Sequence, residues 1–521
     1  MDISEKLYQI GKIVISFFSL IIFSYLSWNS FIVRPYMPLN YGEYIVFFKQ
    51  SPLIILLVFS IFIFLISIRP WLERIKISIL FIIGAIIHSF FFIYTLFTIK
   101  LNIRADSDLV MKNTKNILNG KYSDISDVAG YLSMNPHQLG LSTFEQIVLK
   151  IFNEPIVFVV LNFIFLITSI YLVSRINDNL GITKMTNKYF ILLANLFLPI
   201  YLHVFFIYGH LPSIFFFTLG LFFLTQNSKN YLQIILGSFL ISIAYLLRSN
   251  TIIFIIALLI FLVLQAIKEK KIKNIMLVIT IITTIILSSN LMRIHYESLI
   301  KQKLHPGTPM ISYVAMGLRD LDPSDDHVGG WWDGFNSTLL VENNYNQKKA
   351  QYISKRELDK AIKKHQTDSR FSNLFFRRKI ISTWLEPTFQ SVWSGPIEVD
   401  DFKQTFGPLK SLYGEGELSD ILNGYMSAFL ILTYTLVFLA IVLLLFLDKE
   451  FLNYLFYQLT FIGGFIFHII WETKSQYVFL YIFLVLPILS FSLDKFSKIL
   501  LKIIYVYSSK RVDKFIDQKY S

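Results

Sequence analysis

The sequence predicts an all-α polytopic membrane protein, and its composition and the spacing of its apolar stretches carry this prediction. Of the 521 residues, 54% are hydrophobic and 16% are charged, whereas soluble domains average roughly 45–50% and about 25%. Apolar stretches close to the roughly 20 residues that cross a bilayer recur from residue 13 to residue 493. We therefore expect one membrane-embedded unit rather than several soluble domains.

The apolar stretches predict about twelve transmembrane helices. The first follows Lys6 and Lys12 and lacks a small-residue cleavage site, which is typical of a retained signal anchor with a cytoplasmic N-terminus. The expected spans are residues 13–33, 52–68, 77–99, 155–173, 189–207, 211–225, 231–247, 251–267, 275–292, 425–447, 451–470 and 477–493.

Lysine and arginine residues are concentrated in the connections on one side of these spans. The positive-inside rule places that side in the cytoplasm, so both termini are expected there and the long loops 100–154 and 293–424 are expected outside. The net charge of +13 then favours contact with anionic membrane lipids rather than with nucleic acid. The basic residues are Arg69, Arg74, Lys76, Arg175, Lys184, Lys188, Lys268, Lys270, Lys271, Lys273, Lys495, Lys498, Lys502, Lys510, Arg511, Lys514 and Lys519.

Both long loops carry helical patterns. Ser107 is expected to cap a helix that ends at Gly120, and Ser142 with Glu145 forms a capping-box pattern ahead of a short one-sided helix, expected to lie in the membrane interface. Further helices are expected at 350–365 and 371–385. We thus divide the chain into a transmembrane module (1–292) that includes the loop at about 100–154, a large outer loop (293–424), C-terminal spans (425–493) and a basic cytoplasmic tail (494–521).

Two carboxylates follow the third span at the expected outer surface, in the segment Arg104-Ala-Asp106-Ser-Asp108. Such a pair can provide a general base, or can hold a divalent cation that neutralises a leaving phosphate. Acidic residues are also favoured at a helix N-terminus without any function, and Asp108 has Lys112 four residues on. Asp106 is less well explained in this way and is the stronger candidate.

Several other residues at the outer ends of spans are candidate substrate contacts. Arg248 has no acidic neighbour in the sequence, and its planar guanidinium suits a phosphate, although it can also reach lipid headgroups. His137 lies in the turn-rich segment 131–140, and His210 follows Gly209 at the end of a span. Lys474 and Tyr477 belong to the short outer turn Trp471-Glu-Thr-Lys-Ser-Gln-Tyr477, where an aromatic, an acidic and a basic residue meet.

The large loop contains Gly329-Gly-Trp331-Trp332-Asp-Gly-Phe-Asn336. Its paired tryptophans suit the face of a sugar ring or, equally, the membrane interface. The chain has no cysteine, which excludes a disulfide framework, a thiolate metal site and a cysteine nucleophile. Any catalysis therefore uses carboxylate, histidine, lysine, arginine, tyrosine or hydroxyl groups.

These features together resemble the GT-C superfamily of membrane glycosyltransferases, which move a sugar from a polyprenyl-phosphate carrier to an acceptor. The shared features are an acid in the first large outer loop, an interfacial helix after it, a dozen spans and a large outer loop before the last spans. The segment from Asp106 to Gly140 and the closing turn 471–477 resemble Gram-positive members in particular. The resemblance implies that Asp106 is the catalytic base, assisted by Asp108.

The resulting expectation is an inverting glycosyltransferase of the cell membrane that decorates a cell-wall or surface glycopolymer at the outer leaflet. Asp106 would deprotonate the acceptor hydroxyl while Arg248, Lys474 and His210 stabilise the leaving lipid phosphate. A Mg²⁺ or Mn²⁺ ion held by Asp106 and Asp108 is compatible with this mechanism but not required.

Three alternatives stay open. A surface polysaccharide polymerase would use a lipid diphosphate donor. A transporter or lipid-oligosaccharide flippase is expected to carry charged residues in the middle of several spans, which are nearly absent here. A receptor or scaffold would not need the two carboxylates.

Overall fold

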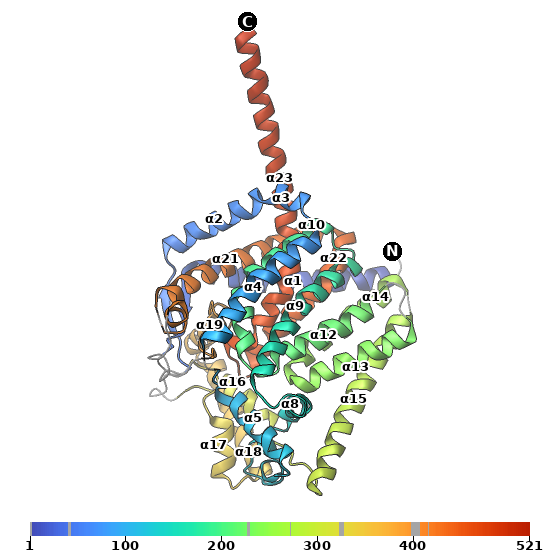
Figure 1. Cartoon of the computed structure of the whole chain (residues 1–521), viewed down its shortest axis with the longest axis vertical. Helices are drawn as coiled ribbons and strands as arrows, with labels where there is room; N and C mark the ends of the chain where they lie inside the picture. The colour runs from blue at the N-terminus through green and yellow to red at the C-terminus, as the bar shows by residue number, and fades with distance from the viewer. Residues whose placement is uncertain are drawn as a thin grey trace.

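The structure is a bundle of helices, as the sequence predicts (Figure 1). It is a computed structural model that describes residues 3–39, 43–99, 101–226, 230–270, 272–321, 328–396, 407–414 and 416–520. Helices account for 79% of the residues and strands for 2%. The all-α prediction is therefore confirmed at this level, and one short hairpin is added to it.

Nine helices within the described residues are long and apolar enough to cross a membrane. This number confirms a polytopic membrane protein. Two of the nine spans each combine two elements: α2 (Pro52–Ser67) with α3 (Arg69–Arg74), and η3 (Ser249–Thr251) with α14 (Ile252–Glu269). The other seven spans lie in α1 (Ile3–Ile32), α4 (Ile77–Thr98), α9 (Ile156–Asn179), α15 (Ile272–Ile300), α21 (Glu417–Phe446), α22 (Asp448–Ile470) and α23 (Phe479–Tyr520).

The other three predicted spans are short or bent. α10 (Lys184–Leu196) is followed by α11 (Leu198–Leu202) and η2 (His203–Phe205), and the pair is bent by 56°. Pro199 lies in the first turn of α11, and a proline there cannot continue the hydrogen bonding of the preceding helix. α12 (His210–Thr225) and α13 (Tyr231–Leu247) have 16 and 17 residues. The predicted count of twelve includes these three segments.

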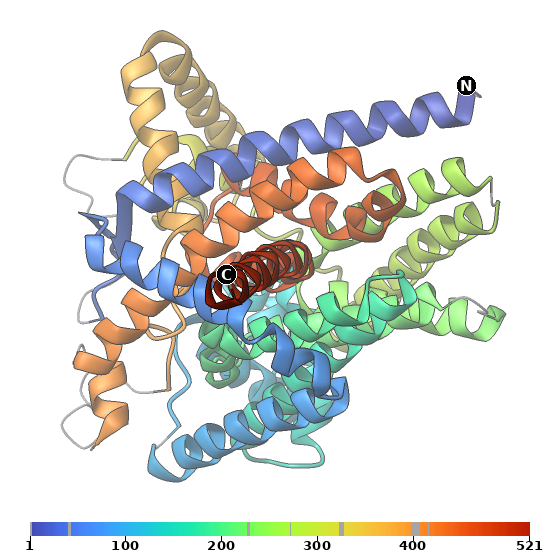
Figure 2. The same ribbon diagram turned by 90° about the horizontal axis from the view of Figure 1, so that it is seen from above.

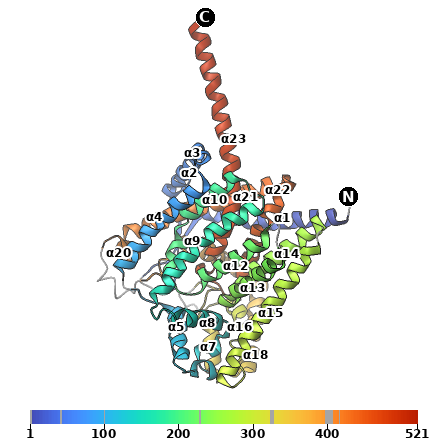
Figure 3. The same cartoon turned by 45° about the vertical axis from the view of Figure 1, so that its right-hand side comes forward.

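Most helices of the two long loops gather at the end of the molecule opposite the projecting end of α23, whereas α19 (Ser369–Trp384) and α20 (Pro408–Tyr413) lie nearer its middle (Figures 1 and 3). The start of the second loop is hydrogen-bonded to the first, since the Thr308 N–H donates to the Met134 carbonyl at 2.8 Å. The first loop forms α5 (Ala105–Leu118), α6 (Ser123–Ser126), α7 (Tyr131–Met134), η1 (Pro136–Gln138) and α8 (Leu139–Leu149). The second forms α16 (Met310–Leu318), α17 (Phe335–Glu342), α18 (Gln347–Thr367), α19 (Ser369–Trp384) and α20 (Pro408–Tyr413), and η5 (Ser475–Tyr477) lies in the last turn.

Both predicted capping residues of the first loop are wrong. Arg104 caps α5, and Ser107 lies inside the helix, where its hydroxyl donates to the Arg104 carbonyl at 2.8 Å. α8 begins before Ser142 because the turn at Pro136 runs directly into it. The Glu145 carboxyl is buried, accepts a hydrogen bond from Thr114 at 2.8 Å, and has its pKa raised to about 8 by burial.

The predicted end of α5 is confirmed. Gly120 has a φ of +73°, and the next N–H, of Lys121, donates back to the Asn116 carbonyl at 2.9 Å. The helices expected at 350–365 and 371–385 also exist, as α18 and α19.

A hairpin that the sequence analysis did not predict joins α1 to α2. β1 (Val33–Tyr36) pairs antiparallel with β2 (Val46–Lys49), with Val33 opposite Lys49 and Tyr36 opposite Val46. Met37 and Ile45 pack with Val328 and Trp331 of the second loop in one small apolar cluster. The first outer connection therefore lies against the large loop, as the alternation of spans requires.

α23 lies at the centre of the bundle and is seen end-on in Figure 2. Within its most apolar window 89% of the residues are buried, against 11% in α15. The peripheral helices expose large apolar side chains, among them Leu53 on α2 and Phe97 on α4, which are 75% and 89% exposed. Such faces are stable only against lipid.

The last predicted span and the predicted basic tail (494–521) belong to one helix, whose candidate membrane span ends at Ile503. α23 is continuous from Phe479 to Tyr520 and includes Pro487. Of the basic residues used for the topology prediction, Lys271 lies outside the described residues.

Candidate functional site

Three segments meet at the level of the backbone where the spans join the outer loops. Gly140, at the start of α8, lies so close to the end of α13 that an added Cβ would be 1.9 Å from the Leu246 carbonyl oxygen. Gly209, with a φ of +77°, lies in the same way against the carbonyl of Leu247, at 2.8 Å. These contacts need glycine, and they bring together the residues on either side of them: Gln138, Tyr208 and Arg248.

A tyrosine links the predicted base to the predicted phosphate ligand. The Tyr208 hydroxyl donates to Asp106 Oδ2 at 3.2 Å and accepts from Gln138 Nε2 at 2.7 Å. The guanidinium carbon of Arg248 lies 4.4 Å from the centre of the Tyr208 ring. Burial raises the pKa of the Tyr208 phenol, so it remains a donor at neutral pH. Asp106 itself is exposed and accessible to a second substrate.

The backbone just before Asp106 is strained. Ala105 has a φ of +53°, in the left-handed region that costs an alanine about 1 kcal/mol or more. This conformation starts α5 and thereby fixes the direction of the Asp106 side chain. Strain of this kind is often found at functional sites.

Arg248 lies against two aromatic rings and has no acidic partner among the described residues. Its guanidinium carbon is 4.4 Å from the centre of the Tyr208 ring and 5.6 Å from that of Tyr477. Its Nε is buried without a hydrogen-bond partner, and none of the ion pairs among the described residues includes Arg248. An arginine oriented in this way is available to an anionic ligand.

Arg248 lines a cavity of about 450 Å³. Aromatic side chains form part of its wall: Trp471 stacks on Tyr313, with ring centres 5.8 Å apart, and on Phe467 at 5.2 Å. The cavity also has polar lining residues, namely His137, Gln138, Tyr208, Ser249, Asn250, Thr308, Glu472 and Tyr477. A flat aromatic wall beside hydrogen-bonding groups is suited to a sugar ring.

Glu472 is a site residue to which the sequence analysis assigned no role. It is 5% exposed and lines the cavity, and its Oε1 has no hydrogen-bond partner. Burial raises the pKa of this carboxyl to about 7, while the nearby charges of Lys474, Lys379 and Arg248 act in the opposite direction. Its place between Trp471 and Lys474 in the outer turn was the available signal.

The outer turn is fixed to the large loop by backbone hydrogen bonds and by one buried lysine. The Glu472 N–H donates to the Tyr313 carbonyl at 3.1 Å, and the Thr473 N–H to the Gly330 carbonyl at 3.0 Å. Lys379 Nζ donates to the carbonyls of Gly317, Ile469 and Trp471 at 2.6–2.9 Å. Burial lowers the pKa of Lys379 to about 7. This network positions the Trp471 and Glu472 side chains.

Lys474 is not available as a second phosphate ligand. Its ammonium pairs with the Glu43 carboxylate and lies 5.2 Å from the centre of the Trp332 ring. Both members of the pair are about nine-tenths buried, with side chains 11% and 12% exposed. A partnered, buried ammonium gives little net charge to a ligand, so the structure corrects this assignment.

The two tryptophans of the large loop differ in access. Trp331 is fully buried, and its Nε1 donates to the Ser382 hydroxyl at 3.0 Å. It therefore offers no face to a sugar, contrary to the sequence-based expectation. Trp332 is 40% exposed and lies beside Lys474, outside the set of residues that line the cavity. Trp471 and Tyr313 provide the aromatic wall instead.

The two candidate histidines differ in their access to the cavity. His137 is exposed and lines the cavity together with Gln138. His210 is buried behind Tyr208, with ring centres 6.1 Å apart, and its Nε2 has no partner. Since His210 does not line the cavity, direct contact with a leaving phosphate is not supported. Tyr477, by contrast, does line it.

The surroundings of Asp108 match the non-functional explanation, that of an acidic residue in the first turn of a helix with Lys112 as its partner. It pairs with Lys112 at 2.5 Å, one helical turn on. Residues two apart on a helix point roughly 200° away from each other, so Asp106 and Asp108 do not converge on one ion. Among the described residues there is no group of three or more histidine or carboxylate side chains placed to hold a metal.

The described groups therefore form one constellation: an accessible carboxylate, a tyrosine bridge, an unpaired arginine and an aromatic cavity wall. Such groups can deprotonate a hydroxyl and stabilise an anionic leaving group within one site. Comparisons with known protein families, with characterised proteins and with solved structures give no match to this chain. The geometry of this cavity is therefore the available guide to function.

Proposed function

We propose that this protein is a membrane glycosyltransferase that moves a sugar from a polyprenyl-phosphate donor to a hydroxyl of a surface glycopolymer, with inversion at the anomeric carbon. The observation that carries the proposal is the Asp106–Tyr208–Arg248 arrangement at the mouth of an aromatic cavity. It supplies a base and an unpaired cation at one site, from segments far apart in the sequence.

The reaction needs one bond to form and one to break at the anomeric carbon. The acceptor oxygen forms a bond to this carbon as its proton passes to the Asp106 carboxylate. The bond from the carbon to the donor phosphate breaks, and the electron pair leaves with the phosphate oxygen. Arg248 stabilises the added negative charge there, because its planar guanidinium can make two parallel hydrogen bonds to a phosphate.

The cavity walls then have separate tasks. Trp471 and Tyr313 provide aromatic surface in the cavity wall against which the sugar ring packs. Glu472, buried and unpartnered at Oε1, accepts or donates a hydrogen bond to a sugar hydroxyl and so contributes to the choice of sugar. Gln138 orients the Tyr208 hydroxyl, which keeps the Asp106 carboxylate in position.

The proposal is tested with purified full-length protein and a panel of polyprenyl-phosphate sugars, measuring both sugar transfer and release of the lipid phosphate. Asp106→Asn is expected to lower turnover by roughly 10²–10⁴ through loss of the base. Asp127→Asn, an exposed aspartate of the same loop, is the matched control and should retain normal turnover.

Three outcomes would contradict the proposal. Normal turnover in the Asp106→Asn variant would remove the base from the mechanism. Activity with lipid diphosphate donors alone would favour a polysaccharide polymerase, and movement of the lipid across vesicles without release of its phosphate would favour a flippase.

A further inference from the structure

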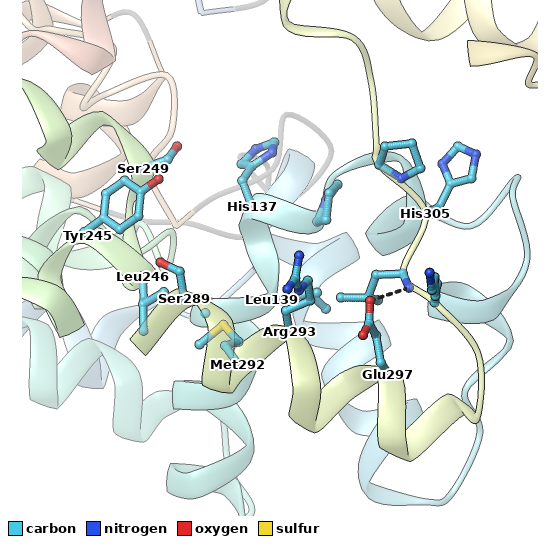
Figure 4. A pocket seen from close by; sticks show the side chains of 15 residues that line it. His137, Leu139, Tyr245, Leu246, Ser249, Ser289, Met292, Arg293, Glu297 and His305 are labelled. Carbon is cyan, nitrogen blue, oxygen red and sulfur yellow. Dashed lines mark hydrogen bonds between the residues drawn. The ribbon is translucent and has the colours of Figure 1, made fainter. Parts of the chain in front are cut away.

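A second chamber of about 510 Å³ adjoins the candidate active site (Figure 4). It shares His137, Tyr245 and Ser249 with the first cavity. Its far wall comes from the end of α15 and the chain that follows, with Arg293, Glu297, Lys303 and His305 among the lining residues. The two spaces are therefore neighbours that share one wall.

The charged side chains that line this chamber differ in whether they make hydrogen bonds. Glu297 Oε1 accepts a hydrogen bond from the Leu304 N–H at 3.3 Å, drawn as a dashed line in Figure 4. The side chains of Arg293 and Lys303 take part in no hydrogen bond or ion pair among the described residues, and both are exposed. Figure 4 shows the Arg293 side chain pointing into the chamber, toward the level of His137 and His305.

The chamber thus presents two cations, Arg293 and Lys303, and one carboxylate, Glu297, so its charged side chains sum to a net positive charge. Groups that carry negative charge and accept hydrogen bonds, above all phosphate, are the ligands that such a pair favours. A polyprenyl-phosphate donor carries a single phosphate, which Arg248 accounts for in the first cavity. An anionic group bound in this chamber would therefore come from another molecule.

We propose that this second chamber binds an anionic group of the acceptor, so that the acceptor is a polymer with phosphate groups along its backbone. This inference rests on the proposed glycosyltransferase function. One repeating unit would present its hydroxyl to Asp106 while the phosphate of another unit lies between Arg293 and Lys303. The chamber opens among the loop helices, away from the cytoplasmic end of α23 that the charge bias predicts, and a bulky polymer can reach it from there.

The test measures binding, so it does not depend on turnover. The probe is fluorescently labelled short-chain polyphosphate, titrated into the full-length protein in a neutral detergent. The double variant Arg293→Glu/Lys303→Glu should bind polyphosphate at least about tenfold more weakly, as loss of two charged contacts predicts. A labelled neutral dextran oligomer of similar length should bind both proteins equally.

A matched double variant controls for a general loss of positive charge. Lys355→Glu/Arg356→Glu makes the same two changes on an exposed face of α18 in the same loop, and should alter polyphosphate binding less than twofold. Equal weakening in the two double variants, or none in the chamber variant, would overturn the proposal.

Two further arms separate the source of the phosphate. If polyprenyl phosphate binding falls in the chamber variant instead, the site belongs to the donor and the acceptor assignment is overturned. If phosphatidylglycerol at the same phosphate concentration displaces polyphosphate from the wild type, the chamber holds a lipid headgroup, and the assignment is again overturned. If the chamber variant loses polyphosphate binding but the wild type shows no transferase activity, the anion site is supported and only the proposed glycosyltransferase function is contradicted.

Discussion

Arg248 is the residue whose surroundings decide between two interpretations of an outer arginine. An arginine that only reaches lipid headgroups needs no orientation, whereas this guanidinium lies close to the rings of Tyr208 and Tyr477, and its Nε has no partner. Packing against aromatic rings restricts the directions in which a planar guanidinium can donate hydrogen bonds. That edge is what a donor phosphate would contact.

This geometry predicts a graded loss in donor use. Arg248→Lys should lower kcat/KM for the polyprenyl-phosphate donor roughly tenfold, because lysine keeps the charge and loses the two-point contact. Arg248→Ala should lower it by roughly 10²–10³, the range known for lost transition-state donors. Transfer rates are measured against donor concentration. A silent Arg248→Lys variant would instead indicate contact with headgroups, since lysine reaches them equally well.

The raised pKa of Glu472 predicts that binding of the donor depends on pH. Its pKa is raised to about 7, so the carboxyl is neutral below that pH and anionic above it. The diester phosphate of the donor does not titrate in this range and would be repelled by the anionic form. KM for the donor should therefore rise between pH 6 and pH 8, by roughly tenfold for a like charge at short range.

Glu472→Gln keeps the shape of the side chain and removes its titration. Its KM for the donor should stay flat across the same pH range, near the low-pH value of the wild type. The measurement is donor KM at constant ionic strength. A pH profile that is identical in the variant and the wild type would show that another group titrates.

At the scale of elements, the site depends on how closely α8 and α13 approach. Gly140 faces the carbonyl of Leu246, at 1.9 Å for an added Cβ, two residues before Arg248. Gly140→Ala must push the two helices apart, and overpacking of this kind costs about 1–3 kcal/mol. Because Gln138 and Arg248 lie on the two segments involved, activity should fall together with the unfolding temperature.

A second helical glycine provides the control. Nothing lies within 4 Å of a Cβ added at Gly424 in α21, and alanine there should be neutral or stabilise by about 0.5–1 kcal/mol. Unfolding temperature is followed by tryptophan fluorescence in detergent. Unchanged stability and activity in Gly140→Ala would show that the close approach of these helices is not required.

At the scale of the whole molecule, the candidate site is useful for a surface polymer only if the loop end of the bundle faces outside. Most helices of both long loops lie at one end (Figures 1 and 3), so one experiment orients them together. Cysteines introduced at Ser123 and Ser337 should react with a membrane-impermeant thiol reagent in intact cells, and one at Ser509 should not. The chain has no native cysteine, so there is no background labelling. Labelling at Ser509 alone would reverse the orientation.

The sequence by itself determined the class of the fold and the positions of most spans. Long apolar runs leave a chain few choices other than membrane helices, because every backbone polar group must be satisfied within lipid. It also indicated Asp106 and Arg248, since charged residues at the ends of spans are conspicuous against apolar surroundings. Helix starts were less accurate: Ser107 and Ser142 have capping residue types but lie inside α5 and α8.

Only the tertiary structure decided which of the candidate residues lie together. Tyr208 joins Asp106 to Arg248 because glycines let three separate segments touch, and neither residue type nor spacing encodes that contact. In the same way, Lys474 was an apparent free cation until Glu43, from a distant hairpin connection, paired with it. Burial of Trp331 and the position of Trp471 in the cavity wall likewise depend on packing between the large loop and the last outer turn. Local sequence sets which groups are present, whereas long-range contacts set which of them are left unpaired.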